Sequence, residues 1–162
     1  MIPKAFFVTG GKAVGKVSSL NAFDLALKNA GIGNCNLVSV SSIIPPNCKE
    51  VPPQEIPTGS ITYAVIAKAE GRGGVISAGI AWGIAKEGYG VVAEAYGSMD
   101  ENALRETLEK RILEMASIRG IKLQKIKYKI ESLDVPEGDY GCAVAALVYP
   151  VSYTHLTLPT KA

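Results

Sequence analysis

The stretch VSSIIPP at residues 40–46 decides where a predicted strand ends and a proline-rich loop begins. Pro45 cannot donate a hydrogen bond to a sheet ladder, and its ring biases the preceding residue toward an extended backbone. Ser41 and Ser42 therefore lie at the end of a strand that we predict over residues 36–43. The residues alone leave two interpretations open. They are either two serines at an ordinary strand end, or they flank a peptide bond that a neighbouring hydroxyl can attack.

Two segments of the chain have the pattern of a helix. The first covers residues 21–30, where apolar side chains recur at helical spacing and Gly31 follows as a stop. The second begins near Ser98 and Glu101, which have the spacing of a capping box, and it ends at Gly120. Its buried face is expected to consist of Leu104, Leu108, Ile112, Met115 and Ile118.

Strands are more numerous than helices in this sequence. Apolar or alternating segments indicate strands at residues 5–9, 36–43, 60–69, 75–85, 91–96, 125–130 and 142–149. Because helices and strands do not alternate regularly, we predict an α+β fold with mostly antiparallel sheets. A chain of 162 residues buries roughly 70% of its unfolded surface. We therefore expect one domain over residues 1–150.

The composition argues against several classes of function. The formal net charge is +2, so no large electrostatic field favours nucleic acid or a membrane surface. No apolar run approaches the roughly 18 residues of a membrane span, and no signal-peptide pattern is present. The three cysteines lack CxxC spacing, which argues against a zinc site or a disulfide framework. We expect a cytoplasmic protein with no metal, membrane or nucleic-acid partner.

Residues 151–162 differ in character from the rest of the chain. They resemble the translation of a sequencing adapter, and we interpret them as a non-native tail at the end of a truncated gene. The tail contains His155, which is the only histidine of the sequence. The working domain then has no histidine for acid–base chemistry, which argues against a Ser-His-Asp hydrolase.

A glycine-rich run near the N-terminus suggests a nucleotide site. GGKAVGK, from Gly10 to Lys16, has the GxxxxGK spacing of a phosphate-binding loop between a strand and a helix. The pattern departs from that motif at Val17, where a serine or threonine hydroxyl should bind Mg²⁺. The two interpretations are a P-loop nucleotide hydrolase and a plain glycine-rich connection.

Glu94 is a carboxylate in an apolar segment. On a strand it shares a face with Val92, so we expect it to be buried, which would raise its pKa. A carboxyl group with a raised pKa suits a proton donor near neutral pH. The alternative is a glutamate at a strand edge without a catalytic role.

Several segments, taken in order, closely resemble the pyruvoyl-dependent arginine decarboxylases. The resemblance covers nearly all of residues 1–149, and the linked set NAxD, NAGIGN and SSIxPP is its most specific part. The matching segments are NAFD at 21–24, NAGIGN at 29–34, NL at 36–37, SSIIPP at 41–46, PTG at 57–59, ISA at 76–78, EAYG at 94–97 and GCAVAA at 141–146.

The resemblance implies an αββα sandwich that processes itself. The hydroxyl of Ser42 would attack the carbonyl of Ser41, and the chain would divide into residues 1–41 and 42–150. Ser42 would become a covalent pyruvoyl group, the cofactor that accepts electrons as CO₂ leaves L-arginine to give agmatine. The family is also known to form homotrimers with sites at subunit interfaces. An uncleaved, non-catalytic α+β trimer remains the alternative.

The resemblance also assigns roles to single residues of this chain. Glu94 would donate a proton to the decarboxylated carbon, and Asn36 would lie near the reactive group during processing. Asp24 would pair with the substrate guanidinium, a charge-assisted contact. The remaining substrate-binding residues are Leu27, Gly33 and Ile43, with Leu27 and Ile43 lining the aliphatic part of the pocket.

Overall fold

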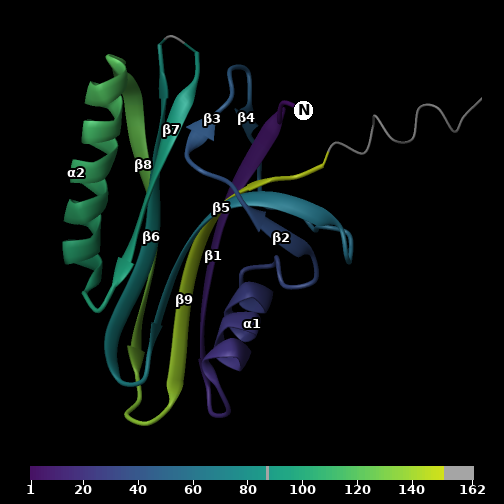
Figure 1. Ribbon diagram of the computed structural model, residues 1–162, viewed down its shortest axis with the longest axis vertical. Helices are drawn as coiled ribbons and strands as arrows, with labels where there is room; N and C mark the ends of the chain where they lie inside the picture. The colour runs from purple at the N-terminus through teal and green to yellow at the C-terminus, as the bar shows by residue number, and fades with distance from the viewer. Residues whose placement is uncertain (87, 152–162) are drawn as a thin grey trace, which may run out of the picture.

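The computed structural model describes residues 1–86 and 88–151, and it has four layers. Two sheets pack face to face, and one helix covers the outer face of each sheet (Figure 1). The helices are α1 (Ser19–Asn29) and α2 (Glu101–Arg119). The predicted α+β class and its αββα arrangement are therefore confirmed.

Most neighbouring strands within each sheet are antiparallel. One sheet has the order β2-β5-β9-β1-β4 and the other β3-β7-β6-β8. Among the described residues, only the short strands β2 and β4 pair in parallel with their neighbours. The strands are β1 (Ala5–Gly15), β2 (Asn36–Ser39), β3 (Ile43–Ile44), β4 (Lys49–Glu50), β5 (Ile61–Gly71), β6 (Gly74–Ala85), β7 (Gly90–Gly97), β8 (Leu123–Val135) and β9 (Tyr140–Tyr149).

Strand β9 shows how the layers are held together. Its residues are apolar on both faces because both faces are covered. Ala145 and Leu147 pack between the two sheets, whereas Val144 and Val148 pack beneath α1. A third apolar cluster, around Leu108, lies between α2 and the second sheet. Burying apolar area in three stacked layers provides the main stabilisation of such a sandwich.

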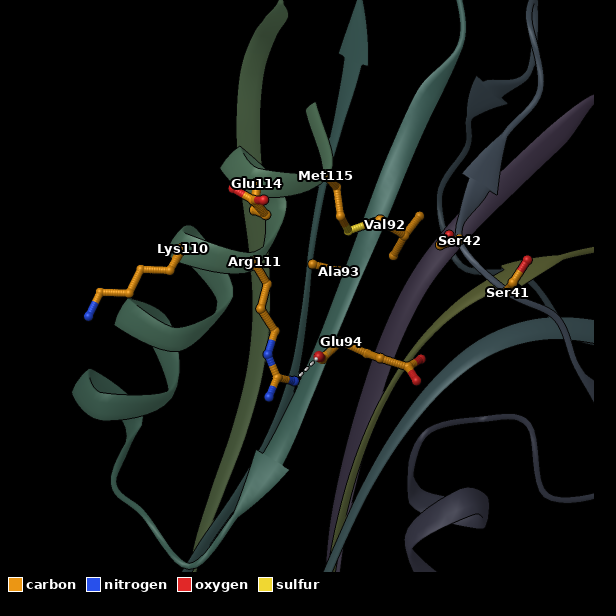
Figure 2. A pocket seen from close by; sticks show the side chains of 9 residues that line it. All are labelled: Ser41, Ser42, Val92, Ala93, Glu94, Lys110, Arg111, Glu114 and Met115. Carbon is orange, nitrogen blue, oxygen red and sulfur yellow. Dashed lines mark hydrogen bonds between the residues drawn. The ribbon is translucent and has the colours of Figure 1, made fainter. Parts of the chain in front are cut away.

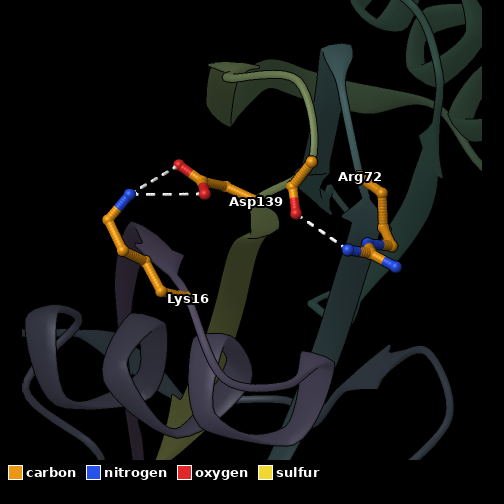
Figure 3. Close-up of polar contacts among 4 residues, drawn as sticks. Lys16, Arg72 and Asp139 are labelled. Atoms are coloured by element: carbon orange, nitrogen blue, oxygen red, sulfur yellow. Dashed lines mark hydrogen bonds and ion pairs between the residues drawn. The ribbon is translucent and has the colours of Figure 1, made fainter.

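Neither interpretation of the glycine-rich run, as a phosphate-binding loop or as a plain connection, describes its structure. Gly10 and Gly15 both belong to β1 and pair with β9, so the run is sheet backbone rather than a free glycine-rich loop. Gly11 instead permits close helix packing, because a Cβ atom there would collide with the carbonyl of Ala26 on α1. Lys16 forms an ion pair with Asp139 at 3.1 Å, beside the turn between β8 and β9 (Figure 3).

Arg72 also stabilises the turn between β8 and β9. The Arg72 guanidinium donates a hydrogen bond of 2.8 Å to the carbonyl of Gly138 (Figure 3). It also lies 4.0 Å from the ring centre of Tyr140. Lys16 and Arg72 therefore both have structural partners at this turn.

Several predicted boundaries were also wrong. Helix α2 is capped by Asp100, whose carboxylate accepts a 2.8 Å hydrogen bond from the Ala103 N–H, and not by Ser98. Its buried face ends earlier than expected, because Ile118 is 71% exposed. The strand expected over 36–43 is divided into β2 and β3, which belong to different sheets. The predicted tail, 151–162, lies outside the described residues except for Val151.

No helix among the described residues is both long and apolar enough to cross a membrane.

Candidate active site

The chain crosses from one sheet to the other at the serine pair. The N–H of Val40 donates a 2.9 Å hydrogen bond to the carbonyl of Ala64 on β5, in the first sheet. The carbonyl of Ser42 accepts a 2.9 Å hydrogen bond from the N–H of Val92 on β7, in the second sheet. The bond between Ser41 and Ser42 therefore spans the space between two anchored strands.

Cavities adjoin this crossing on two sides. The larger has a volume of about 560 Å³ and is walled by β7 and α2 (Figure 2). A volume in this range suits a small-molecule ligand. The other measures about 330 Å³ and is bounded by the N-terminal residues and by tyrosines of β5 and β9. The larger is lined by Ser41, Ser42, Val92, Ala93, Glu94, Lys110, Arg111, Glu114 and Met115.

Glu94 lies on β7 beside this crossing. It shares a face with Val92, which packs between the sheets, while Ala93 faces α2. The expected burial is wrong, because the side chain of Glu94 is exposed in the single chain. Its carboxylate points away from α2, toward the side on which Ser41 and Ser42 lie (Figure 2). Even so, the surrounding protein partly desolvates the carboxylate and raises the pKa of Glu94, as expected.

Arg111 modifies the environment of Glu94. Its guanidinium donates a 2.7 Å hydrogen bond to the backbone carbonyl of Glu94 (Figure 2). The positive charge opposes the desolvation and lowers the pKa of the Glu94 carboxyl. Arg111 was not predicted from the sequence. The sequence shows only that it directly precedes Ile112, which lies on the apolar face of α2.

Four of the predicted site residues line neither of the two cavities beside the crossing. Asp24 is exposed on α1, and Leu27 is half-buried on the same helix. Gly33 follows α1 closely, since a Cβ atom there would lie 2.8 Å from Cα of Lys28. The side-chain amide of Asn36 donates a 2.9 Å hydrogen bond to the carbonyl of Gly59.

The predicted site thus consists of two separate groups. One group surrounds the crossing and contains Ser41, Ser42, Ile43 and Glu94. The other lies on α1 and β2 and contains Asp24, Leu27, Gly33 and Asn36. As formed by the described residues, neither cavity beside the crossing includes a member of this second group.

Fold and site together define a class: αββα sandwiches with a serine pair on the crossover between the sheets and a carboxylate close by. Residues 5–153 match the family model described as pyruvoyl-dependent arginine decarboxylase. The chain therefore belongs to the pyruvoyl-dependent arginine decarboxylase family.

Curated relatives resemble the chain over almost its whole length. The pyruvoyl-dependent arginine decarboxylase of Methanopyrus kandleri is 40% identical over 148 residues, which cover 91% of this chain and 97% of that protein. The protein of the same name from Methanothermobacter thermautotrophicus is 35% identical over 88% of this chain and 93% of its own length. A solved pyruvoyl-dependent histidine decarboxylase aligns with a TM-score of 0.47 and 18% identity, over 58% of this chain and 52% of that one.

Proposed function

We propose that this chain cleaves itself between Ser41 and Ser42 and then decarboxylates L-arginine to agmatine and CO₂. The observation that carries the proposal is the position of the serine pair. In this chain, which belongs to the family, the pair bridges the two sheets and adjoins a cavity of about 560 Å³ that Glu94 also lines. Intact-mass analysis of the purified protein, together with CO₂ release from labelled arginine, tests both parts.

The self-cleavage uses atoms that are already joined. The Oγ of Ser42 attacks the carbonyl carbon of Ser41, the C–N bond breaks, and an ester replaces the peptide. Removal of the Ser42 α-proton then breaks the Cβ–O bond and releases Ser41 as a new carboxylate terminus. The remaining dehydroalanine takes up water, loses ammonia and becomes the pyruvoyl group at residue 42. Anchoring of Val40 and Ser42 to opposite sheets holds both sides of the bond during this sequence.

The surroundings of residue 42 fit a pyruvoyl group. Ser42 is half-buried, and the adjoining cavity has an apolar wall that includes Val92 and Met115. Once formed, the pyruvoyl group supplies the carbonyl groups that accept the electrons released as CO₂ leaves. Glu94 holds the proton that the reacting carbon needs after decarboxylation.

Replacing Arg111 with glutamine should move the pH profile of the decarboxylation upward. Arg111 lowers the pKa of Glu94, so its loss lets the carboxyl keep its proton to a higher pH. If protonated Glu94 is the donor, the decline of kcat at high pH shifts to higher pH. The measurement is kcat against pH at saturating arginine. Lys110→Gln removes an equal charge from the adjacent residue and serves as the control; a high-pH decline that stays in place in Arg111→Gln contradicts the prediction.

The second group of site residues is proposed to act on a neighbouring subunit in a homotrimer. Asn36, Val38 and Ile61 lie on the same face of the first sheet, on β2 and β5. This part of the face is exposed, since Val38 is 40% and Ile61 59% exposed. Exposed apolar residues beside a polar site are typical of an interaction surface. In the proposed homotrimer, Asp24 would take part in a site shared with a neighbouring subunit, and its carboxylate suits a guanidinium.

Co-expression of two inactive variants tests the shared site. Ser42→Ala retains the Asp24 carboxylate but forms no pyruvoyl group. Asp24→Asn forms the pyruvoyl group but lacks that carboxylate. If one site uses both subunits, random mixing should restore about a quarter of the wild-type sites. Ser42→Ala with Glu94→Gln is the control, because these two residues line one cavity of the same chain and should not complement. Absence of recovery in the first pair would place the whole site within one subunit.

A further inference from the structure

The hydroxyl of Tyr149 reaches the segment that follows the serine pair. Tyr149 is the last residue of β9, is 6% exposed and packs between the two sheets. Its hydroxyl donates a 2.8 Å hydrogen bond to the backbone carbonyl of Ile43. It also lines the cavity of about 330 Å³ that adjoins Ser41 and Ser42.

This contact completes a set of three anchors on residues 40–43. Val40 is held by β5 of the first sheet, and the carbonyl of Ser42 is held by β7 of the second sheet. The carbonyl of Ile43 is then held by a side chain from the first sheet. Two successive carbonyl groups are therefore fixed by opposite sheets, which restricts the φ and ψ angles of Ile43 and the orientation of the peptide group that follows Ser42. With Val40 held on the other side, Ser42 has less freedom to rotate, and its φ and χ1 angles decide where its Oγ lies relative to the Ser41 carbonyl.

We propose that Tyr149 is a positioning residue for the self-cleavage, acting through the carbonyl of Ile43. The inference rests on the proposed function, because it assumes that Ser42 attacks Ser41. Attack within a chain is fast only when the reacting atoms are held close together and aligned. The hydrogen bond from Tyr149 limits the movement of the attacking residue without contacting the reacting atoms.

The environment keeps the Tyr149 hydroxyl in its donor form. Burial, with a smaller contribution from the neighbouring Cys48 thiol, raises the pKa of Tyr149 far above its usual range. The phenol therefore remains protonated at every pH at which the protein would act. A hydrogen-bond donor here is a permanent feature of the fold.

The contact is also predicted to outlast the cleavage. Tyr149 and Ile43 both belong to the larger product, which begins at residue 42, whereas Val40 belongs to the smaller one. After the bond breaks, the hydroxyl still holds the residue that directly follows position 42. Tyr149 should therefore fix the new N-terminal group in the cavity, which would affect turnover more than the binding of arginine.

The test is the time course of self-cleavage in Tyr149→Phe, which keeps the ring and removes only the hydroxyl. Purified precursor is followed by intact mass at a temperature well below its measured melting temperature. Losing one hydrogen bond is expected to slow cleavage about fivefold to tenfold. In the fully cleaved enzyme, kcat should fall by a similar factor with an unchanged KM for arginine. Tyr140→Phe, at the opposite end of β9, is the control and should cleave at the wild-type rate.

The outcomes separate this inference from the proposed function. Wild-type cleavage and turnover with a Tyr149→Phe rate equal to the control would overturn the role of Tyr149 and leave the proposed function intact. A lower melting temperature with an unchanged cleavage rate would show a structural role alone and would also overturn it. A wild-type chain that never cleaves would overturn both. Slower cleavage in Tyr149→Phe but not in Tyr140→Phe, with both variants folded, supports the inference.

Discussion

Replacing Ser42 with alanine is expected to leave the chain in one piece and to abolish CO₂ release from arginine. The Oγ of Ser42 is the attacking atom of the cleavage and the source of the pyruvoyl group. Alanine removes that atom and little else, and the residue is only half-buried at the crossing. The fold should therefore survive. Intact-mass analysis and labelled-arginine turnover measure the two effects in the same preparation.

Ser41→Ala is the matched control for this experiment. Ser41 contributes its carbonyl carbon to the proposed reaction, and its own hydroxyl takes no part. The variant should therefore divide at the same bond and retain most of the activity. Cleavage of Ser42→Ala between residues 41 and 42 would contradict the mechanism. A wild-type chain that stays intact would instead favour the non-catalytic alternative.

Both helices and most strands could be predicted because they have clear patterns, whereas the αββα layering was implied by the family resemblance. Leu104, Leu108 and Ile112 recur at helical spacing and lie fully buried against the second sheet. The continuous apolar run in β9 reflects a strand covered on both faces. In such segments, the pattern in the sequence is a direct consequence of which side chains are buried.

The crossing could not be predicted in the same way. Residues 36–43 read as one strand, because a pattern of side chains does not show which sheet each half joins. The division into β2 and β3 depends on partners far away in the sequence, namely β5 and β7. The glycine run from Gly10 was misinterpreted for a related reason. Gly11 and Gly15 of this run pack closely against α1, and the sequence does not show that contact.

The site was predicted in part for a similar reason. Ser42 and Glu94 could be selected from the sequence through the family motifs, and they line the same cavity. Arg111 and Tyr149 could not, because each acts through a backbone carbonyl of another element. A contact to a backbone carbonyl requires no particular residue type at the accepting position. A single sequence therefore contains no matching pair of residue types from which such a contact could be predicted.

Replacing Glu94 with glutamine is expected to leave self-cleavage complete and to lower kcat by about 10²- to 10⁴-fold, the usual range for loss of a general acid. Glutamine keeps the size of the side chain on the exposed edge of β7, so the cavity and the KM for arginine should change little. The cleavage chemistry depends on Ser42, which the variant retains. The missing function is the transfer of a proton to the carbon that has lost CO₂.

The pH dependence makes this prediction specific. Desolvation raises the pKa of Glu94, so the carboxyl keeps its proton above the usual range and loses it as the pH rises further. Wild-type kcat should therefore fall as the pH rises through that pKa, and the residual activity of Glu94→Gln should lack this decline. Glu106→Gln, an exposed change of equal charge on α2, should retain both the rate and the profile. Unchanged turnover in Glu94→Gln would exclude Glu94 as the proton donor, and the search would move to the other groups that line the cavity.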